Sequence, residues 1–87
     1  MIVSENFGYP PKAWWIKQTK VDEIEKDDPP LGFLNSEWEQ LKALMVPGDE
    51  IWEFDSPGEY WASLAGEAGI VLVRDDTAVF FITTERN

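Results

Sequence analysis

The sequence predicts a two-layer α+β fold, in which about four mainly antiparallel strands form a sheet and two helices cover one face of it, in the order β-α-β-α-β-β. Three observations carry this prediction: short aromatic segments with alternating side chains, two Ser-x-x-Glu patterns that begin amphipathic stretches, and two apolar runs joined by a turn-forming tetrapeptide. A length of 87 residues and an apolar content of 44% favour a single globular domain over residues 1–87.

The N-terminal third is predicted to hold one strand and one acidic loop. Residues 1–12 are rich in glycine and proline and favour an irregular arm. Residues 13–17 are short and aromatic, which is typical of a strand. Residues 21–30 are acidic and end in Asp-Asp-Pro-Pro, so we expect a loop with a helical turn around residues 22–26.

The first long helix is predicted to begin at Ser36. Ser36 and Glu39 form a capping box, in which each side chain satisfies a free backbone N–H at the helix start. Pro47-Gly48 is predicted to end the helix. Its apolar face follows the helical spacing of Trp38, Leu41, Leu44 and Met45.

Residues 50–54 alternate and predict a half-buried strand, with Trp52 and Phe54 pointing inward and Ile51 as an exception on the charged face. A second helix is predicted to begin at the capping box of Ser56 and Glu59 and to stop at Gly66. We expect its inner face to contain Tyr60, Trp61, Leu64 and Ala65.

The last elements are predicted to form a hairpin near the centre of the sheet. Residues 70–73 and 78–83 are apolar on both faces, as expected for strands that are covered on both sides. The linking segment Arg74-Asp75-Asp76-Thr77 is typical of a tight turn.

The composition argues against most catalytic chemistry. The chain contains no histidine and no cysteine, so it lacks the usual general base and thiolate metal ligands. We therefore assign no catalytic, cofactor-binding or metal-binding residue and expect no enzyme activity. The N-terminus lacks the pattern of a secretory signal, and no apolar run approaches the length of a membrane span. These features predict a cytoplasmic protein that needs no membrane.

Aromatic side chains are the first candidates for contact with a partner. Trp14 and Trp15 are adjacent in a predicted strand and should point to opposite faces of the sheet. If helices cover only one face, one of the pair is partly exposed and forms an apolar contact patch with Phe7 and Tyr9. In the alternative interpretation, the N-terminal arm folds over this tryptophan.

Acidic side chains are the second set of candidates. The formal net charge is -10, which repels nucleic acid and attracts a basic protein surface. The predicted loop could bind a cation weakly, but it lacks the central glycine and the ligand spacing of a calcium loop. We predict a solvated acidic loop whose contact candidates are Asp22, Glu23, Glu25, Asp27 and Asp28.

The segment Val-Pro-Gly-Asp-Glu-Ile-Trp-Glu-Phe from Val46 onward, with Ser56-Pro57, Trp61, Leu64-Ala65-Gly66, Gly69 and Leu72-Val73-Arg74-Asp75, resembles small bacterial proteins with the same C-terminal arrangement. The resemblance covers residues 46–87. It implies an origin in bacteria or their phages, and the relatives have no established activity to transfer.

We expect a non-enzymatic acidic module that binds a protein with a basic surface. Two alternatives remain open. One is a nucleic-acid mimic that inhibits a DNA-binding protein or nuclease. The other is a small-ligand binder or carboxylate-based enzyme with a site at Glu50, Glu53 and Tyr60. An edge strand at 13–17 or 78–83 could also pair with a second copy of the chain.

Overall fold

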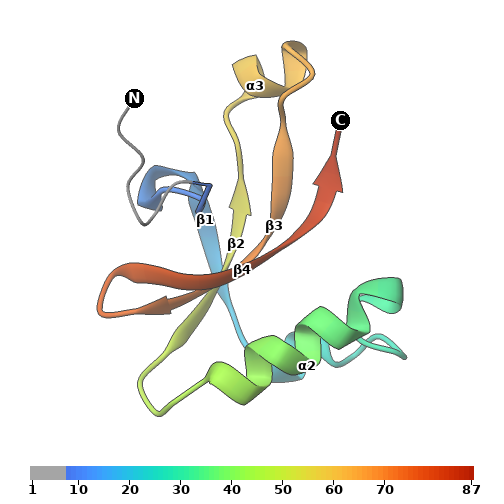
Figure 1. The fold of residues 1–87 in the computed structure, drawn as a ribbon, viewed down its shortest axis with the longest axis vertical. Coiled ribbons are helices and arrows are strands. Elements are labelled where there is room, and N and C mark those ends of the chain that lie inside the picture. The colour runs from blue at the N-terminus through green and yellow to red at the C-terminus, as the bar shows by residue number, and fades with distance from the viewer. Residues whose placement is uncertain (1–7) are drawn as a thin grey trace.

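The computed structural model describes residues 8–87 and contains a four-stranded sheet in the order β1-β2-β3-β4 (Figure 1). Every neighbouring pair of strands is antiparallel. The predicted α+β class and antiparallel sheet are therefore confirmed. The strands are β1 (Trp15–Thr19), β2 (Glu50–Asp55), β3 (Glu67–Arg74) and β4 (Thr77–Arg86).

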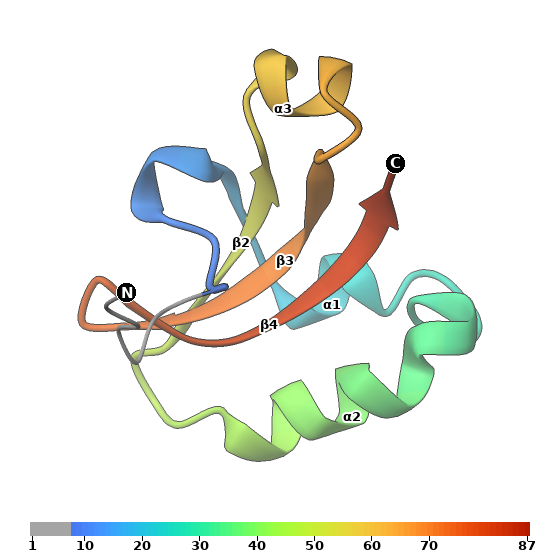
Figure 2. The same cartoon turned by 45° about the horizontal axis from the view of Figure 1, so that its top comes forward.

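The helices lie at different places around this sheet. Figures 1 and 2 show α2 along one face, α1 near it at the end of β1, and α3 beyond the far end of β2 and β3. Residues 8–87 contain no helix that is long and apolar enough to cross a bilayer. The helical segments are α1 (Val21–Ile24), α2 (Asn35–Leu44), α3 (Gly58–Ala62) and the 3-10 turns Lys12–Trp14 and Gly32–Leu34.

The prediction that two helices cover one face is wrong for α3. The Ser56 N–H donates to Glu67 O at 3.0 Å, and the Glu67 N–H donates to Ser56 Oγ at 3.0 Å. These bonds hold the end of β2 beside the start of β3. The connection that contains α3 therefore stays beyond this end of the sheet and does not cover its face (Figure 2). The predicted inner face is also wrong, because Tyr60 and Leu64 are exposed.

Both predicted capping boxes are wrong for a related reason. The Ser36 hydroxyl lies 2.5 Å from a carboxylate oxygen of Glu37, and α2 already begins at Asn35 after a 3-10 turn. The Ser56 hydroxyl accepts a hydrogen bond from the Glu67 N–H at the start of β3, and α3 begins only at Gly58. Each serine hydroxyl therefore bonds to another partner instead of capping the backbone N–H groups at the helix start that the Ser-x-x-Glu spacing predicts.

The face under α2 holds the larger core cluster. Trp38 and Leu41 are fully buried, as the helical spacing predicts, whereas Leu44 is 48% exposed. Ile51 is 2% exposed, so the predicted exception is a core residue. The strand residues that pack against Trp38 and Leu41 are Ile51, Ile70, Leu72 and Ile82.

The opposite face holds a second cluster, which the N-terminal segment covers. Phe54, Val71 and Val73 are buried there. Trp52 packs against them but is only half-buried, so its predicted inward position is confirmed in direction only. Burial on both faces explains why β2 and β3 carry apolar side chains at successive positions.

The hairpin prediction is confirmed, and its placement is corrected. Asp75 and Asp76 have φ of 52° and 63°, the pattern of a two-residue type I′ turn. β3 lies inside the sheet, but β4 forms one edge and β1 the other. The segments that we expected to be edge strands, 13–17 and 78–83, overlap these two edges.

Candidate protein-interaction site

Tyr9, Trp14 and Trp15 lie together in the aromatic cover of the second face. The Trp15 Nε1–H donates to Pro10 O at 3.0 Å, and Pro10 is buried. The ring centroids of Tyr9 and Phe81 are 5.4 Å apart in a tilted arrangement, within the distance range of favourable aromatic pairs. The described part of the N-terminal arm, residues 8–11, therefore folds over the tryptophans, while residues 1–7 lie outside the described chain.

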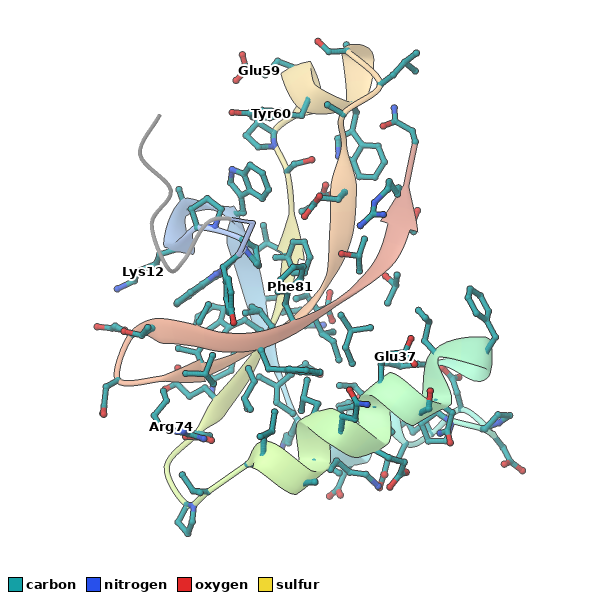
Figure 3. The ribbon with its side chains drawn as sticks, in the orientation of Figure 1. Lys12, Glu37, Glu59, Tyr60, Arg74 and Phe81 are labelled. Atoms are coloured by element: carbon teal, nitrogen blue, oxygen red, sulfur yellow. The ribbon has the colours of Figure 1, made fainter. Side chains whose placement is uncertain are left out.

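The expectation that Trp14 and Trp15 point to opposite faces is wrong. Both side chains are half-buried and pack against the same cluster. The alternation of side chains does not apply to them, because β1 begins at Trp15 and Trp14 belongs to the preceding 3-10 turn. Trp14 instead contacts Tyr60 of α3 with a centroid distance of 5.4 Å, and Figure 3 shows Tyr60 at the α3 end of the sheet.

The acidic candidates lie on α1 and the loop that follows it, on the opposite side of the sheet from the aromatic cover. Glu25 has partners within the chain: it accepts a bond from Trp38 Nε1 at 3.0 Å and pairs with Lys42 at 2.5 Å. The Lys42 ammonium lowers the pKa of Glu25 below its usual range. Glu23 pairs with Lys26 at 3.2 Å. Asp22, Asp27 and Asp28 are exposed and stand outside these pairs.

Most of the positive charge in residues 8–87 is already paired. Lys12, Lys26, Lys42 and Arg74 each have a carboxylate within 4.0 Å. Many carboxylates within residues 8–87 form no ion pair with a lysine or arginine, so the surface keeps a strong negative field. The carboxylates outside ion pairs are Asp22, Asp27, Asp28, Glu37, Glu50, Glu53, Asp55, Glu59, Glu67, Asp75 and Glu85.

Some of these carboxylates rim an open groove on the α2 side of the sheet. The groove has a volume of about 390 Å³. Its walls include apolar residues from three elements and a loop, namely Ile16, Ile24, Ile70 and the loop residue Leu31, beside the small residues Ala68 and Gly69. Its acidic residues are Asp27, Glu53, Asp55 and Glu85, and within residues 8–87 its lining has no lysine or arginine. We call this feature the acid-rimmed groove.

The strands create the groove because α2 covers only part of this face. Side chains at alternate positions of a strand share one face, so Ile51, Glu53 and Asp55 lie on the same side of β2. Ile51 is buried under α2, whereas Glu53 and Asp55 line the part of this face that α2 does not cover. The register between β1 and β2 shifts at Ile16, and this bulge leaves the Ile16 side chain 61% exposed. At Gly69 an added Cβ would lie 2.0 Å from Ile82 O, so the floor needs glycine there.

A second trough of about 640 Å³ adjoins the groove along β1. It shares Thr19, Ile24 and Glu53 with the groove, but Lys17 and Lys20 also line it, so its charge is mixed. The acid-rimmed groove is therefore the feature with the clearer chemical preference, for a ligand that is both cationic and apolar.

Of the groove residues, sequence reasoning named Asp27 as a protein contact and Glu53 only as part of the alternative ligand site. A signal was present, because Glu53 and Asp55 share the face of Ile51 in a strand. The exposed face could not be located without knowing where α2 ends on the sheet. Among the described residues, 8–87, no three acidic side chains converge closely enough to hold a metal ion.

Comparisons with protein-family models, curated proteins and solved structures give no match to this chain.

Proposed function

We propose that the chain is a non-enzymatic acidic module that binds a protein with a basic surface, in the cytoplasm of a bacterium or in a phage-infected cell. The observation that carries this proposal is the acid-rimmed groove, which combines an apolar floor with carboxylates that form no ion pair among residues 8–87. Binding sites with a buried apolar centre and a charged rim are common in transient protein complexes.

The surface charge supports the same proposal. The three paired lysines and Arg74 contribute little to the outer field, whereas within residues 8–87 carboxylates outside ion pairs extend from α1 to the end of β4. Such a field accelerates the encounter with a basic partner, and apolar contacts in the groove then slow dissociation. The aromatic residues are not the proposed anchor, because Tyr9 and Trp15 are held in contacts within the chain.

Affinity capture tests this function. Proteins retained by the immobilised chain from a bacterial lysate at low salt are purified singly and titrated at low and high salt. We expect saturable binding by proteins with basic surfaces, and a Kd that increases with salt. Binding that is indifferent to salt for every purified protein would contradict the proposal.

Charge variants give the matched control. Asp22→Asn with Asp28→Asn removes two exposed carboxylates and should slow association. Lys17→Gln with Lys20→Gln removes two exposed cations and should not slow it. Competition by duplex DNA for a captured partner would favour the nucleic-acid mimic instead.

A further inference from the structure

The acid-rimmed groove occupies the half of a sheet face that α2 leaves open. Leu72 and Ile51 are buried where α2 lies over the sheet, and Ile16 is 61% exposed where it does not. α1 and the following loop close one side of this space through Ile24 and Leu31. The open half is therefore bounded by protein and keeps apolar surface in solvent.

The direction of the groove indicates the shape of its occupant. Its lining draws on all four strands, through Ile16, Glu53, Ala68 and Thr84, so it crosses the sheet. A strand that added to the sheet would contact one edge, β1 or β4, and would not fill this space. A helix beside α2 would fill it, because helices in two-layer folds pack on the face of the sheet.

The chain does not supply that helix from its described residues. The sequence pattern predicts a second helix on this face, but α3 is short and lies beyond the end of the sheet (Figure 2). The position next to α2 is thus open to a helix from another molecule.

The charges around the groove define the surface of that helix. Asp27 stands on the loop side, Glu53 and Asp55 on β2, and Glu85 on β4, so carboxylates flank the apolar floor on several sides. A helix with an apolar stripe would place its flanking side chains against these carboxylates. Lysine or arginine at those positions would be complementary.

We propose that the acid-rimmed groove binds an amphipathic helix of the partner protein, with an apolar stripe flanked by lysine or arginine. The inference rests on the proposed function and names the partner chemistry at its site.

Three synthetic peptides test the shape and the charge of the occupant. The first has about 15 residues of leucine and lysine, with leucine at helical spacing. The second has the same composition with leucine and lysine alternating, and the third is the first with glutamate in place of lysine. Fluorescence anisotropy of labelled peptides should give the first peptide a Kd at least ~10-fold lower than either of the others. Equal binding by the first and second peptides would overturn the helix proposal.

Charge-reversal variants locate the binding site. Glu53→Lys with Glu85→Lys changes the groove rim, and Asp22→Lys with Glu59→Lys changes the net charge equally outside its lining. Figure 3 shows Glu59 at the α3 end of the sheet. We expect the rim variant to weaken the first peptide at least ~10-fold and the control variant to weaken it much less. Equal weakening would place binding elsewhere.

An apolar pair of variants serves as the second test. Ile16 and Leu64 are 61% and 77% exposed, so Ile16→Ser and Leu64→Ser should both fold with an unchanged circular dichroism spectrum. Only Ile16→Ser should weaken the first peptide. If it does not, the apolar floor is not the binding surface.

The captured partners separate the two proposals. If they bind the rim variant and the control variant equally, the groove assignment fails while the acidic-module function stands. If the wild-type chain captures no protein with a basic surface, the proposed function fails even where a peptide binds.

Discussion

Arg74 binds Asp49 through two hydrogen bonds, from Nε to Oδ1 at 2.9 Å and from Nη2 to Oδ2 at 2.8 Å. The same Nη2 donates to Leu44 O at 2.9 Å, and the Val46 N–H donates to Asp49 Oδ2 at 3.0 Å. The pair therefore joins the end of α2, the turn before β2 and the last residue of β3. Figure 3 shows Arg74 at the end of the sheet near α2.

This pair predicts acid sensitivity in a defined pH range. The Arg74 guanidinium, aided by the Val46 N–H, lowers the pKa of Asp49 from 3.8 to about 2. Between these two pKa values the unfolded chain binds more protons than the folded chain, so stability decreases as the pH is lowered. We expect the contribution of Asp49 to be complete above about pH 5 and to be lost progressively as the pH falls through 2.

Urea unfolding at several pH values between 2 and 5 checks this, with Asp49→Asn as the comparison. The variant should be less stable at pH 6 and should show a shallower decline below pH 4. Glu25 leaves some decline in both proteins, because Lys42 lowers its pKa in the same way. Parallel curves for the two proteins would contradict the prediction.

A second prediction concerns the face of α2 that packs on the sheet. Leu41 is fully buried and Leu44 is 48% exposed on the same helix. Leu41→Ala should lower the free energy of unfolding by about 2–5 kcal/mol, because it removes buried contacts and leaves a cavity. Leu44→Ala should cost roughly 1 kcal/mol or less. Similar losses in urea unfolding would show that α2 packs in another orientation.

A third prediction tests the close approach of β3 and β4. Gly69→Ala would place a methyl group 2.0 Å from Ile82 O, whereas Gly58→Ala in α3 adds one in open space. The first change should cost about 1–3 kcal/mol by overpacking. The second should be neutral or stabilise by about 0.4–1 kcal/mol. Thermal unfolding of both variants distinguishes them, and a harmless Gly69→Ala would refute the strand spacing.

A fourth prediction concerns Trp15, which the sequence suggests as an exposed contact. Trp15 packs against Trp52 with a centroid distance of 6.2 Å and bonds to Pro10. Trp15→Ala should therefore destabilise the fold by about 1–3 kcal/mol, less than a fully buried tryptophan would. Trp15→Phe keeps most of the packing and should lose about 1 kcal/mol through the hydrogen bond. An unaffected unfolding midpoint in Trp15→Ala would restore this residue as a candidate anchor.

Sequence patterns correctly predict those parts of the fold that depend on interactions between residues close in the sequence. The spacing of Trp38 and Leu41 identifies the buried face of α2, and the Asp75-Asp76 turn identifies the hairpin. Both depend on residues that are close in sequence. Ser36 and Ser56 mislead because their hydroxyls find other partners, one of them on β3.

The candidate site depends on relationships that no local pattern contains. Glu53 is recognisable as a strand residue on the face of Ile51. Its exposure in a groove follows from the end of α2, the bulge at Ile16 and the short connection around α3. The cover over Trp15 likewise depends on Pro10, which is placed by the arm and not by the strand.

The indole N–H groups of four tryptophans donate hydrogen bonds to oxygen atoms in different parts of the chain. The Trp15 indole N–H donates to Pro10 O in the arm, and that of Trp38 donates to Glu25 between α1 and α2. The Trp52 indole N–H donates to Glu50 within β2, and that of Trp61 donates to Asp55 and to Ser56 O at the α3 end. Each indole is therefore an intrinsic optical reporter of one region. Variants that keep one such tryptophan at a time would show by fluorescence whether the arm, the helices and the sheet melt together or in sequence, without any attached label.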